Sequence, residues 1–272
     1  MWLDALGELV FVGLGLYDEM DISLRGFEEI REAKAVFVEL YTSLMRGLSL
    51  RRLEKLIGKG LSVVSRHHLE EEKGQIILQK AEREKTVLLV PGDPLIATTH
   101  VDLRIRAEKL GIKTHVIHGA SIISAAIGLS GLQNYKFGRS VTVPFPEEGF
   151  VSETPYQVIK ENRKMGLHTL CFLDVRVEEG RYMTVKDGLQ SLSAVEKQKR
   201  NSVITPNTLV IGVARAGSED SVVKADYIGE VMKYDFGKPP HTIIFPGKLH
   251  FMEAEALITL AKAPESVRGM VA

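Results

Sequence analysis

The sequence predicts an α/β protein with two αβα domains, the first on a parallel sheet and the second on a mixed sheet. Through the first half of the chain, short runs rich in Val, Ile and Leu alternate with amphipathic segments. Such alternation with short connections is typical of parallel strands joined by right-handed helical crossovers. The pattern breaks near residue 138, and in the second half residues 222–227 can pair as a hairpin arm between the strands expected at residues 208–214 and 241–245. We therefore expect domains at residues 1–138 and 139–272, with a mixed sheet in the second.

Composition supports a folded globular protein and excludes several classes. The 272 residues are 44% hydrophobic, enough for a sizeable core, and the 35 basic residues balance the 35 acidic ones. Zero formal charge gives no general reason to expect nucleic acid or an anionic membrane as partner. The single cysteine, Cys171, excludes an intramolecular disulfide or a cysteine-rich metal cage and is expected to be a buried, inert thiol.

The sequence also bears on location. No apolar run reaches the ~20 residues of a membrane span, and residues 1–4 lack the basic start of a signal peptide. We expect a cytoplasmic protein.

The first predicted strand, residues 9–12, runs into a turn that contains Gly13 and Gly15. This order is typical of the opening of a nucleotide-binding fold. In the dinucleotide fingerprint the third glycine would fall at Asp18, where a carboxylate would repel pyrophosphate. An NAD site is therefore disfavoured. Ser23 is expected to cap a helix over residues 24–34.

Residues 36–38 form the second predicted strand, which leaves through the polar and aromatic stretch at residues 39–43. Glu39 and Tyr41 in this stretch can face a site or belong to a plain loop, and both interpretations stay open. A helix over residues 50–57, ended by Gly58, and a strand over residues 61–64 complete this part.

His67 and His68 stand beside three glutamates, which raises the question of a metal site. Adjacent side chains point apart on a helix or a strand, so these two imidazoles cannot chelate one ion together. We expect no metal here, and predict a helix over residues 69–85.

The centre of the chain is a strand over residues 87–90 that stops at a Pro-Gly-Asp-Pro loop, residues 91–94. Neither proline can donate to a sheet, and Gly92 lets the backbone come close to a ligand. Asp93 supplies the only charge in this loop. A small-molecule site and an ordinary tight turn, in which the aspartate binds its own backbone, are both compatible with it.

After a helix over residues 101–110, a strand over residues 114–117 leads into His118. Ser121 is placed to cap the next helix, whose N-terminus either binds a carboxylate or ribose or is simply well capped. Strand exits at Gly13, Glu39, Pro91 and His118 should share one edge, because the carboxyl ends of parallel strands meet there. This convergence predicts a ligand site more strongly than any single motif.

The second half of the chain is also predicted to contain both helices and strands. A helix should start with Thr154 as cap and Pro155 in the first turn, and Thr184 with Asp187 forms a capping box. The expected strands are residues 168–174, 208–214, 222–227 and 241–245, and the expected helices are residues 154–166, 184–199 and a last one after His250.

Taken together, several blocks resemble the tetrapyrrole methylase superfamily, two-domain enzymes that use S-adenosylmethionine. The Gly-Leu-Gly-Leu turn, the Pro-Gly-Asp-Pro loop and the division near residue 138 carry this resemblance. Within the superfamily, the chain is similar over its full length to the diphthine synthase family. The blocks that carry the narrower resemblance are residues 15–23, 39–43, 91–99, 214–218 and 246–250.

The resemblance implies a homodimeric N-methyltransferase whose cofactor is S-adenosylmethionine, with S-adenosylhomocysteine as product and no metal. Its substrate would be translation elongation factor 2, on which the amino group of a 3-amino-3-carboxypropyl-histidine is methylated, with three methyls in archaeal members, to give diphthine in diphthamide biosynthesis. Family cofactor contacts map onto Leu16, Asp93, Ile96, Ser121 and Ile122 in the first domain, and onto Leu173, Ala214 (or Ala216) and His241 in the second.

The chemistry of methyl transfer determines which groups such a site requires. A sulfonium methyl transfers with little covalent help, so orientation does most of the work. The attacking amine must be unprotonated, and burial beside a sulfonium should lower its pKa. We therefore expect no obligatory side-chain base and assign no catalytic residue, although Asp93, Tyr41 and His241 are candidates for accepting a proton.

Lys136, Arg139 and Arg215 are candidates for binding the substrate carboxylate. Two other functions stay open at this point. A tetrapyrrole C-methyltransferase could use the same scaffold, and a non-catalytic nucleotide-binding module would share the sheet and glycine turns.

Overall fold

The structure is a computed structural model that describes residues 7–147 and 149–271. The chain forms two compact units, the first made of Met1–Ile122 with Val177–Glu179 and the second of Ile123–Arg176 with Gly180–Ala272. The boundary expected from the sequence, after Gly138, lies further along the chain and stays a prediction. Residues 1–4, on which the expectation of no signal peptide depends, lie outside the described residues.

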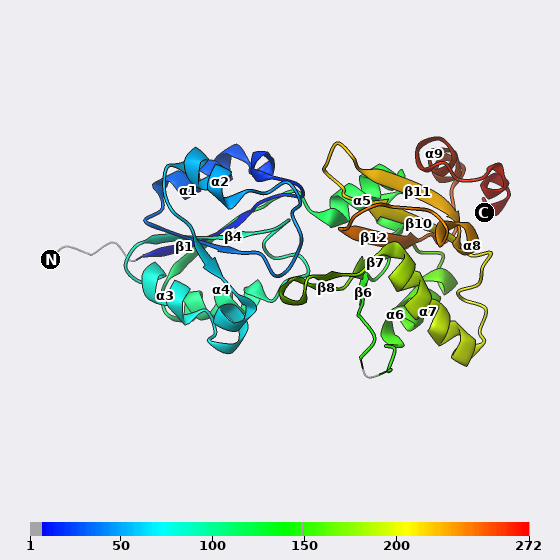
Figure 1. Ribbon diagram of the computed structural model, residues 1–272, viewed down its shortest axis with the longest axis horizontal. Coiled ribbons are helices and arrows are strands. Elements are labelled where there is room, and N and C mark those ends of the chain that lie inside the picture. Colours follow the sequence, from blue (N-terminus) through cyan, green and yellow to red (C-terminus); the bar gives the residue numbers. More distant parts are fainter. Residues whose placement is uncertain (1–6, 148, 272) are drawn as a thin grey trace. The chain divides into compact units, whose positions relative to one another are not determined.

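The first unit is built on a five-stranded parallel sheet (Figure 1). In spatial order its strands are β3 (Ser62–Val64), β2 (Ala35–Glu39), β4 (Lys85–Val90), β1 (Glu8–Gly13) and β5 (Lys113–Ile117). All neighbouring pairs are parallel. The parallel sheet predicted for the first half is confirmed, and every strand ends at the same edge.

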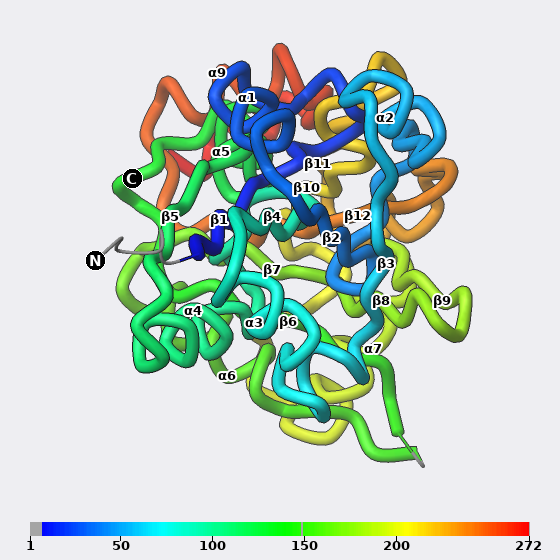
Figure 2. The backbone as a smooth tube through the Cα atoms, turned by 90° about the vertical axis from the view of Figure 1, so that its left-hand side faces the viewer, coloured from blue at the N-terminus to red at the C-terminus, as the bar shows by residue number. Residues whose placement is uncertain are grey.

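Helices cover both faces of this sheet. Figures 1 and 2 show α1 (Leu24–Glu32) and α2 (Leu50–Ile57) on one face, and α3 (Gln75–Ala81) and α4 (His100–Lys109) on the other. Side chains of one strand alternate between the faces, so Val10 and Val12 pack with the α1 and α2 side while Leu9 and Phe11 pack with the α3 and α4 side. Each strand is buried on both sides, which is why the strand sequences are continuous apolar runs.

The single helix predicted over residues 69–85 is wrong. The structure has a π-helical turn, η2 (His67–Glu71), followed by a break and then α3. Lys73 and Gly74 form the break with φ values of 58° and 68°. A Cβ on Gly74 would lie 2.4 Å from Leu103 Cδ1, so close packing on α4 also requires a glycine at this position.

The second unit is built on a mixed sheet, as predicted. In spatial order its strands are β11 (Val222–Tyr227), β10 (Leu209–Ala214), β12 (His241–Phe245), β7 (Thr169–Leu173) and β6 (Val141–Val143). Its pairs are antiparallel except for β6 with β7. A small separate hairpin joins β8 (Val175–Arg176) and β9 (Arg181–Tyr182).

Helices α6 (Thr154–Lys164) and α7 (Val185–Lys199) lie on one face of this sheet, and α5 (Ile122–Ser130) and α9 (Phe251–Ala261) lie on the other (Figures 1 and 2). The main core lies under α6 and α7 and contains the buried thiol of Cys171, whose pKa burial raises. The remaining elements are short: η1 (Glu19–Asp21), η3 (Asn134–Lys136), η4 (Val177–Glu179), α8 (Ile228–Val231) and η5 (Glu265–Met270).

Two helix starts test the capping predictions. The capping box of Thr184 and Asp187 is confirmed, with each side chain bonded to the backbone of the other residue. The assignment of Thr154 as cap is wrong by one residue, because Thr154 is already helical and Glu153 is the cap. In the part of the chain that the structure describes, no helix is both long and apolar enough to span a bilayer.

Candidate functional site

Three strand exits of the first unit meet backbone to backbone at the carboxyl edge of the sheet. Gly15 N donates to Gly92 O at 3.2 Å, and Gly92 N donates to Gly15 O at 2.7 Å. A Cβ on Gly119 would lie 2.4 Å from Gly92 O and 2.9 Å from Gly13 Cα. The loops after β1, β4 and β5 therefore come together at glycines, which are needed for space at Gly15 and Gly119 and for a left-handed backbone at Gly92.

The turn after β1 is fixed by an aspartate further along the chain. Asp21 Oδ2 accepts hydrogen bonds from Leu16 N at 3.0 Å and Tyr17 N at 2.7 Å. Gly15 has a φ of 83°, and a Cβ there would lie 2.3 Å from Asp21 Cβ. Leu16, predicted to contact the cofactor, is thus held in one conformation with its side chain half-buried.

Asp93 uses both carboxylate oxygens. Its Oδ1 accepts from Leu95 N at 3.1 Å, which is the local turn that the sequence left as one alternative. Its Oδ2 lies 2.7 Å from Nδ1 of His118, a residue of the loop after β5. Asp93 is 7% exposed, whereas the His118 side chain is 74% exposed. His118 is one of the strand exits that the sequence predicts at this edge, but its contact with Asp93 is not predicted by the sequence.

The other predicted contacts in the first unit lie at the same edge. Ile96 is 40% exposed, and Ser121 and Ile122 are half-buried. Ser121 directly precedes α5. Partly exposed apolar side chains beside tightly packed glycine backbone form a surface that an organic ligand can cover.

At the exit of β2, the carboxylate of Glu39 is satisfied within the protein, whereas the buried Tyr41 hydroxyl has no hydrogen-bond partner among the described residues. The buried Glu39 accepts from Tyr41 N at 3.0 Å and from Thr42 N at 3.1 Å, and its Oε1 lies 3.3 Å from Nε2 of His100. Burial, followed by the charges of Glu39 and Glu70, raises the pKa of Tyr41. Tyr41 therefore stays protonated at neutral pH and is a poor proton acceptor.

In the second unit, the predicted contacts lie on three neighbouring strands. Ala214 and His241 are register partners on β10 and β12, and Leu173 ends β7, the next strand. All three are buried or nearly so. The alternative Ala216 lies in the loop after β10 and is 7% exposed.

His241 is held as a neutral ring. Burial, assisted by the charge of Arg215, lowers its pKa to about 4 against partial compensation by the carbonyls of Lys238 and Gly237. Its Nδ1 accepts from Val185 N at 3.3 Å, at the start of α7, so the ring proton resides on Nε2. Although those two carbonyls lie near it, Nε2 reaches hydrogen-bond geometry with no described residue. His241 is therefore a hydrogen-bond donor rather than a base.

Two candidates for binding the substrate carboxylate are engaged elsewhere. Lys136 Nζ pairs with Glu253 and donates to Lys248 O at 2.6 Å. Arg215 is 8% exposed and donates to the carbonyls of Phe236 and Lys238 at 2.5 and 2.7 Å. The third candidate, Arg139, is exposed.

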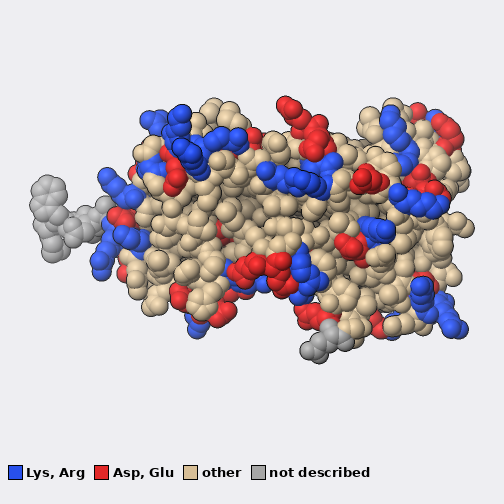
Figure 3. Space-filling view, viewed as in Figure 1, with Lys and Arg blue, Asp and Glu red and all other residues tan. Residues whose placement is uncertain are grey.

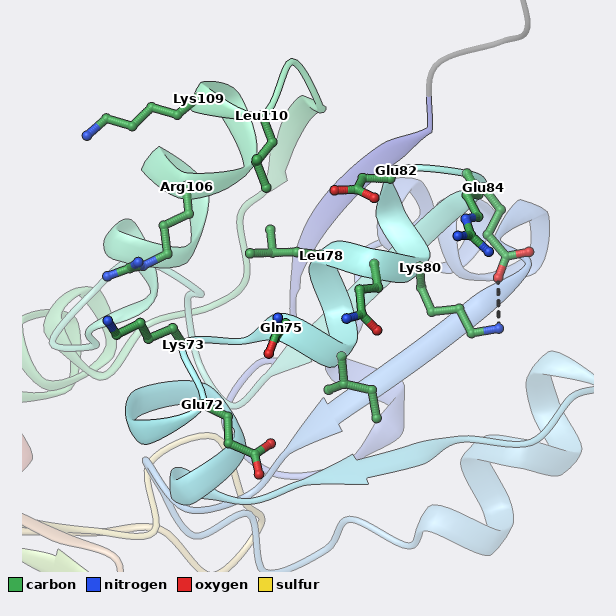
Figure 4. Close-up of a pocket in the computed structure, with 13 residues that line it drawn as sticks. Glu72, Lys73, Gln75, Leu78, Lys80, Glu82, Glu84, Arg106, Lys109 and Leu110 are labelled. Atoms are coloured by element: carbon green, nitrogen blue, oxygen red, sulfur yellow. Dashed lines mark ion pairs between the residues drawn. The ribbon is translucent and has the colours of Figure 1, made fainter.

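A groove on the first unit lies away from this edge. Residues between 72 and 84, in and around α3, and residues at the end of α4 line it, with a volume of about 1230 Å³ (Figure 4). Its wall is mostly charged, and the pair of Lys80 with Glu84 spans 3.5 Å. It contains none of the predicted cofactor contacts, and we do not assign it to the site.

Among residues 7–147 and 149–271, no three His, Cys, Asp or Glu side chains gather as metal ligands. His67 instead contacts Glu71 at 2.8 Å, and His68 contacts Ser65.

Acidic and basic side chains are intermingled on the face shown in Figure 3, in keeping with the balanced charge.

Comparison with known proteins adds to this geometry. The sequence model of the tetrapyrrole (corrin/porphyrin) methylases matches residues 8–231. The diphthine synthase of Methanosarcina acetivorans is 50% identical over 95% of this chain and 98% of its own length. That of Methanosarcina barkeri is 51% identical over 94% of this chain and 97% of its own length. A crystal structure of diphthine synthase matches with a TM-score of 0.88 at 43% identity, covering 97% of this chain and 99% of that one.

Proposed function

Because the chain belongs to the tetrapyrrole methylases and, within them, to the diphthine synthases, it is a methyltransferase, and we propose that its acceptor is elongation factor 2. The group methylated is the amino group of the 3-amino-3-carboxypropyl chain on one histidine of that factor. Three successive transfers give diphthine, the methylated intermediate of diphthamide biosynthesis. The observation that carries this proposal is the identity of about half of all residues to diphthine synthases over nearly the whole chain.

We propose S-adenosylmethionine as the methyl donor. The carboxyl edge of the first unit fits it, since Gly13, Gly92 and Gly119 bring three loops together without side chains between them. Beside them, Leu16 and Ile96 leave apolar surface for an adenosine or a methionine chain. When bound, this cofactor supplies an electrophilic methyl group on a sulfonium.

The remaining contacts follow from the same proposal. Asp93, Ser121 and Ile122 of the first unit, and Leu173, Ala214 and His241 of the second, hold the cofactor. With Nδ1 bonded to Val185, His241 offers the Nε2 proton to an acceptor on the ligand. We also propose the two domains predicted from the sequence, in which residues 1–138 carry the Gly-Asp-Pro loop and residues 139–272 supply the other cofactor contacts.

The chain's own contribution to the reaction is mainly positional. Asp21 holds the backbone of Leu16 and Tyr17, and the glycine bridge between Gly15 and Gly92 ties that turn to the Asp93 loop. A rigid edge of this kind lets an incoming amine line up with the bond that breaks.

Mass spectrometry tests the proposal directly. The protein is incubated with isotopically labelled S-adenosylmethionine and elongation factor 2 carrying the 3-amino-3-carboxypropyl-histidine. We expect label on the modified histidine and none on factor that lacks the modification. Label on a precorrin instead, or no transfer to the modified factor, would overturn the proposal.

We also propose that the protein is a homodimer, as the resemblance implies. Sedimentation equilibrium measures this without reference to activity. A mass of one chain, 30.2 kDa, at micromolar concentration would contradict it.

A further inference from the structure

We propose that His118 accepts the proton that the substrate amine must lose before each methyl transfer, and that Asp93 holds it in the tautomer that can do so. The inference deepens the proposed function and depends on it, because it concerns an amine as methyl acceptor. It assigns a catalytic role to a residue that the sequence places at the predicted edge but that is neither a predicted cofactor contact nor one of the candidates for accepting a proton.

The geometry of the pair fixes the state of the ring. Asp93 Oδ2 lies 2.7 Å from His118 Nδ1. An ionised carboxylate can only accept hydrogen bonds, so the neutral ring carries its proton on Nδ1 and leaves a lone pair on Nε2. Asp93 is 7% exposed and is itself held by Leu95 N, so the carboxylate is a fixed support. A proton taken up at Nε2 gives an imidazolium that this carboxylate stabilises, as in other histidine and carboxylate pairs.

The position of His118 suits the role. It follows the last residue of β5 and precedes Gly119, whose backbone abuts both Gly13 and Gly92. The imidazole thus belongs to the same loop cluster that we propose for the methyl donor. Its side chain is 74% exposed, so Nε2 is accessible to a substrate and can return its proton to solvent.

The other candidates in the described residues are less suited. Tyr41 has a raised pKa and keeps its proton, and His241 has a pKa of about 4 with Nδ1 already bonded to Val185. His100 is 1% exposed and lies against Glu39, away from any external proton. His118 is the histidine that combines a fixed carboxylate partner with an open nitrogen at the carboxyl edge.

The step balances in atoms and charge. The substrate ammonium gives one proton to His118 Nε2, which leaves a neutral amine with a free electron pair. That pair forms the new N–CH₃ bond while the S–CH₃ bond breaks, and its electrons stay on sulfur as a neutral thioether. The imidazolium then releases its proton to water. Three transfers release three protons and end in a quaternary ammonium that has none.

The test compares single-turnover methylation rates of the wild type, His118→Ala and a matched control, His115→Ala. His115 also pairs with a carboxylate, since its Nε2 lies 3.3 Å from Glu8 Oε1, but it sits mid-strand in β5. General-base assistance contributes on the order of 10² or more. We expect His118→Ala to slow the chemical step about 100-fold at pH 7, with little change in donor affinity by calorimetry, and His115→Ala to leave both unchanged.

Two readouts separate proton transfer from a merely structural role. The deficit of His118→Ala should shrink as the pH rises and the substrate amine loses its proton unaided. Added imidazole should restore part of the lost rate at pH 7. A deficit that stays constant with pH and does not respond to imidazole would overturn the proposal.

A measurement without turnover tests the role of Asp93. Long-range ¹H–¹⁵N spectra of histidine-labelled protein report which ring nitrogen carries the proton. We expect the Nδ1–H form for His118 in the wild type at pH 8, and a mixture of tautomers in Asp93→Asn. An Nε2–H form in the wild type would contradict the inference.

The outcomes also distinguish the two proposals. If the wild type fails to methylate the modified elongation factor, the proposed function is wrong. If the wild type methylates it and His118→Ala does so at the same rate at pH 7, the function stands and the assignment of His118 is wrong.

Discussion

At the scale of single residues, three glycines determine whether the candidate site can form. Gly13, Gly92 and Gly119 lie where three loops touch, but they need glycine for different reasons. Gly92 has a φ of 71° and open space around its Cβ position, with the nearest atom 4.0 Å away. For Gly119 the limit is space, since a Cβ would lie 2.4 Å from the carbonyl oxygen of Gly92.

This difference predicts a ranking of alanine substitutions. Gly92→Ala should cost about 1 kcal/mol, the usual penalty of a left-handed alanine. Gly119→Ala must push two backbones apart and should cost about 3 kcal/mol, at the upper end of overpacking, and should abolish donor binding. Gly128→Ala, in α5 with nothing within 4 Å, is the control and should stabilise by about 0.5 kcal/mol. Urea denaturation and calorimetry measure both effects; equal costs for Gly92 and Gly119 would contradict the account.

His241 predicts a specific dependence of stability on pH. Burial lowers its pKa to about 4 from 6.5, so the unfolded chain binds a proton that the folded protein excludes. The stabilising effect is complete above pH 6.5 and is lost as the pH falls from 6.5 to 4. In that window the wild type should lose up to about 1.4 kcal/mol per pH unit more than His241→Gln. Urea denaturation at pH 7, 6, 5 and 4 checks this, and parallel curves for the two proteins would show that His241 is not the cause.

At the scale of elements, the strands and most helices could be predicted because their apolar periodicity is local. The break between η2 and α3 could not, because Lys73 adopts a left-handed conformation that its side chain does not favour. Gly74 was the available hint, yet a lone glycine inside a helical pattern is common. Glycine is needed at position 74 because Leu103 packs there, and Leu103 belongs to a helix that comes later in the chain.

In the candidate site, too, contacts between distant segments could not be predicted from the local sequence. Convergence of Gly13, Pro91 and His118 at one edge followed from parallel strands alone. The contact of Asp93 with His118 joins residues 25 apart and depends on β1 lying between β4 and β5. Strand order is a property of the assembled sheet, so the pair could not be found from spacing.

Glu253, at the start of α9, connects three segments of the second unit, residues 133–136, His168 and the start of α9. It is fully buried and accepts from Gln133 N, His250 N and His168 Nε2 at 2.8, 2.8 and 2.9 Å, and it pairs with Lys136. Burial opposes its charge, but these bonds outweigh burial and lower its pKa. The block at residues 246–250, which carries part of the family resemblance, is tied to the same network, since Gly247 N donates to His168 Nδ1.

Removing this carboxylate should therefore be costly. Glu253→Ala leaves buried donors without acceptors, and we expect a loss of about 3–5 kcal/mol in the free energy of unfolding. Glu265→Ala removes an exposed partner of Arg268 and should leave the free energy of unfolding almost unchanged, because solvent screens such a pair. Urea denaturation of both variants measures the difference. A loss below about 1 kcal/mol for Glu253→Ala would show that the network does not hold these segments together.

At the scale of the whole molecule, the chain presents two units with separate sheets and cores, and the proposed donor contacts belong to both. A ligand that binds only the folded state stabilises by about 2.7 kcal/mol at 100 times its Kd. That stabilisation slows the opening of those segments that the ligand contacts. The contacts assigned to each unit can therefore be tested by local protection, without measuring catalysis.

Hydrogen exchange with saturating S-adenosylhomocysteine tests this consequence. We expect slower exchange of amides in residues 13–17, 92–96 and 119–122 of the first unit, and in segments around Leu173, Ala214 and His241 of the second. Amides of α2, which carries no proposed contact, serve as the internal control and should change least. If protection is confined to the first unit, the contacts assigned to the second are wrong, because a ligand that contacts a segment of the folded state slows the opening of that segment.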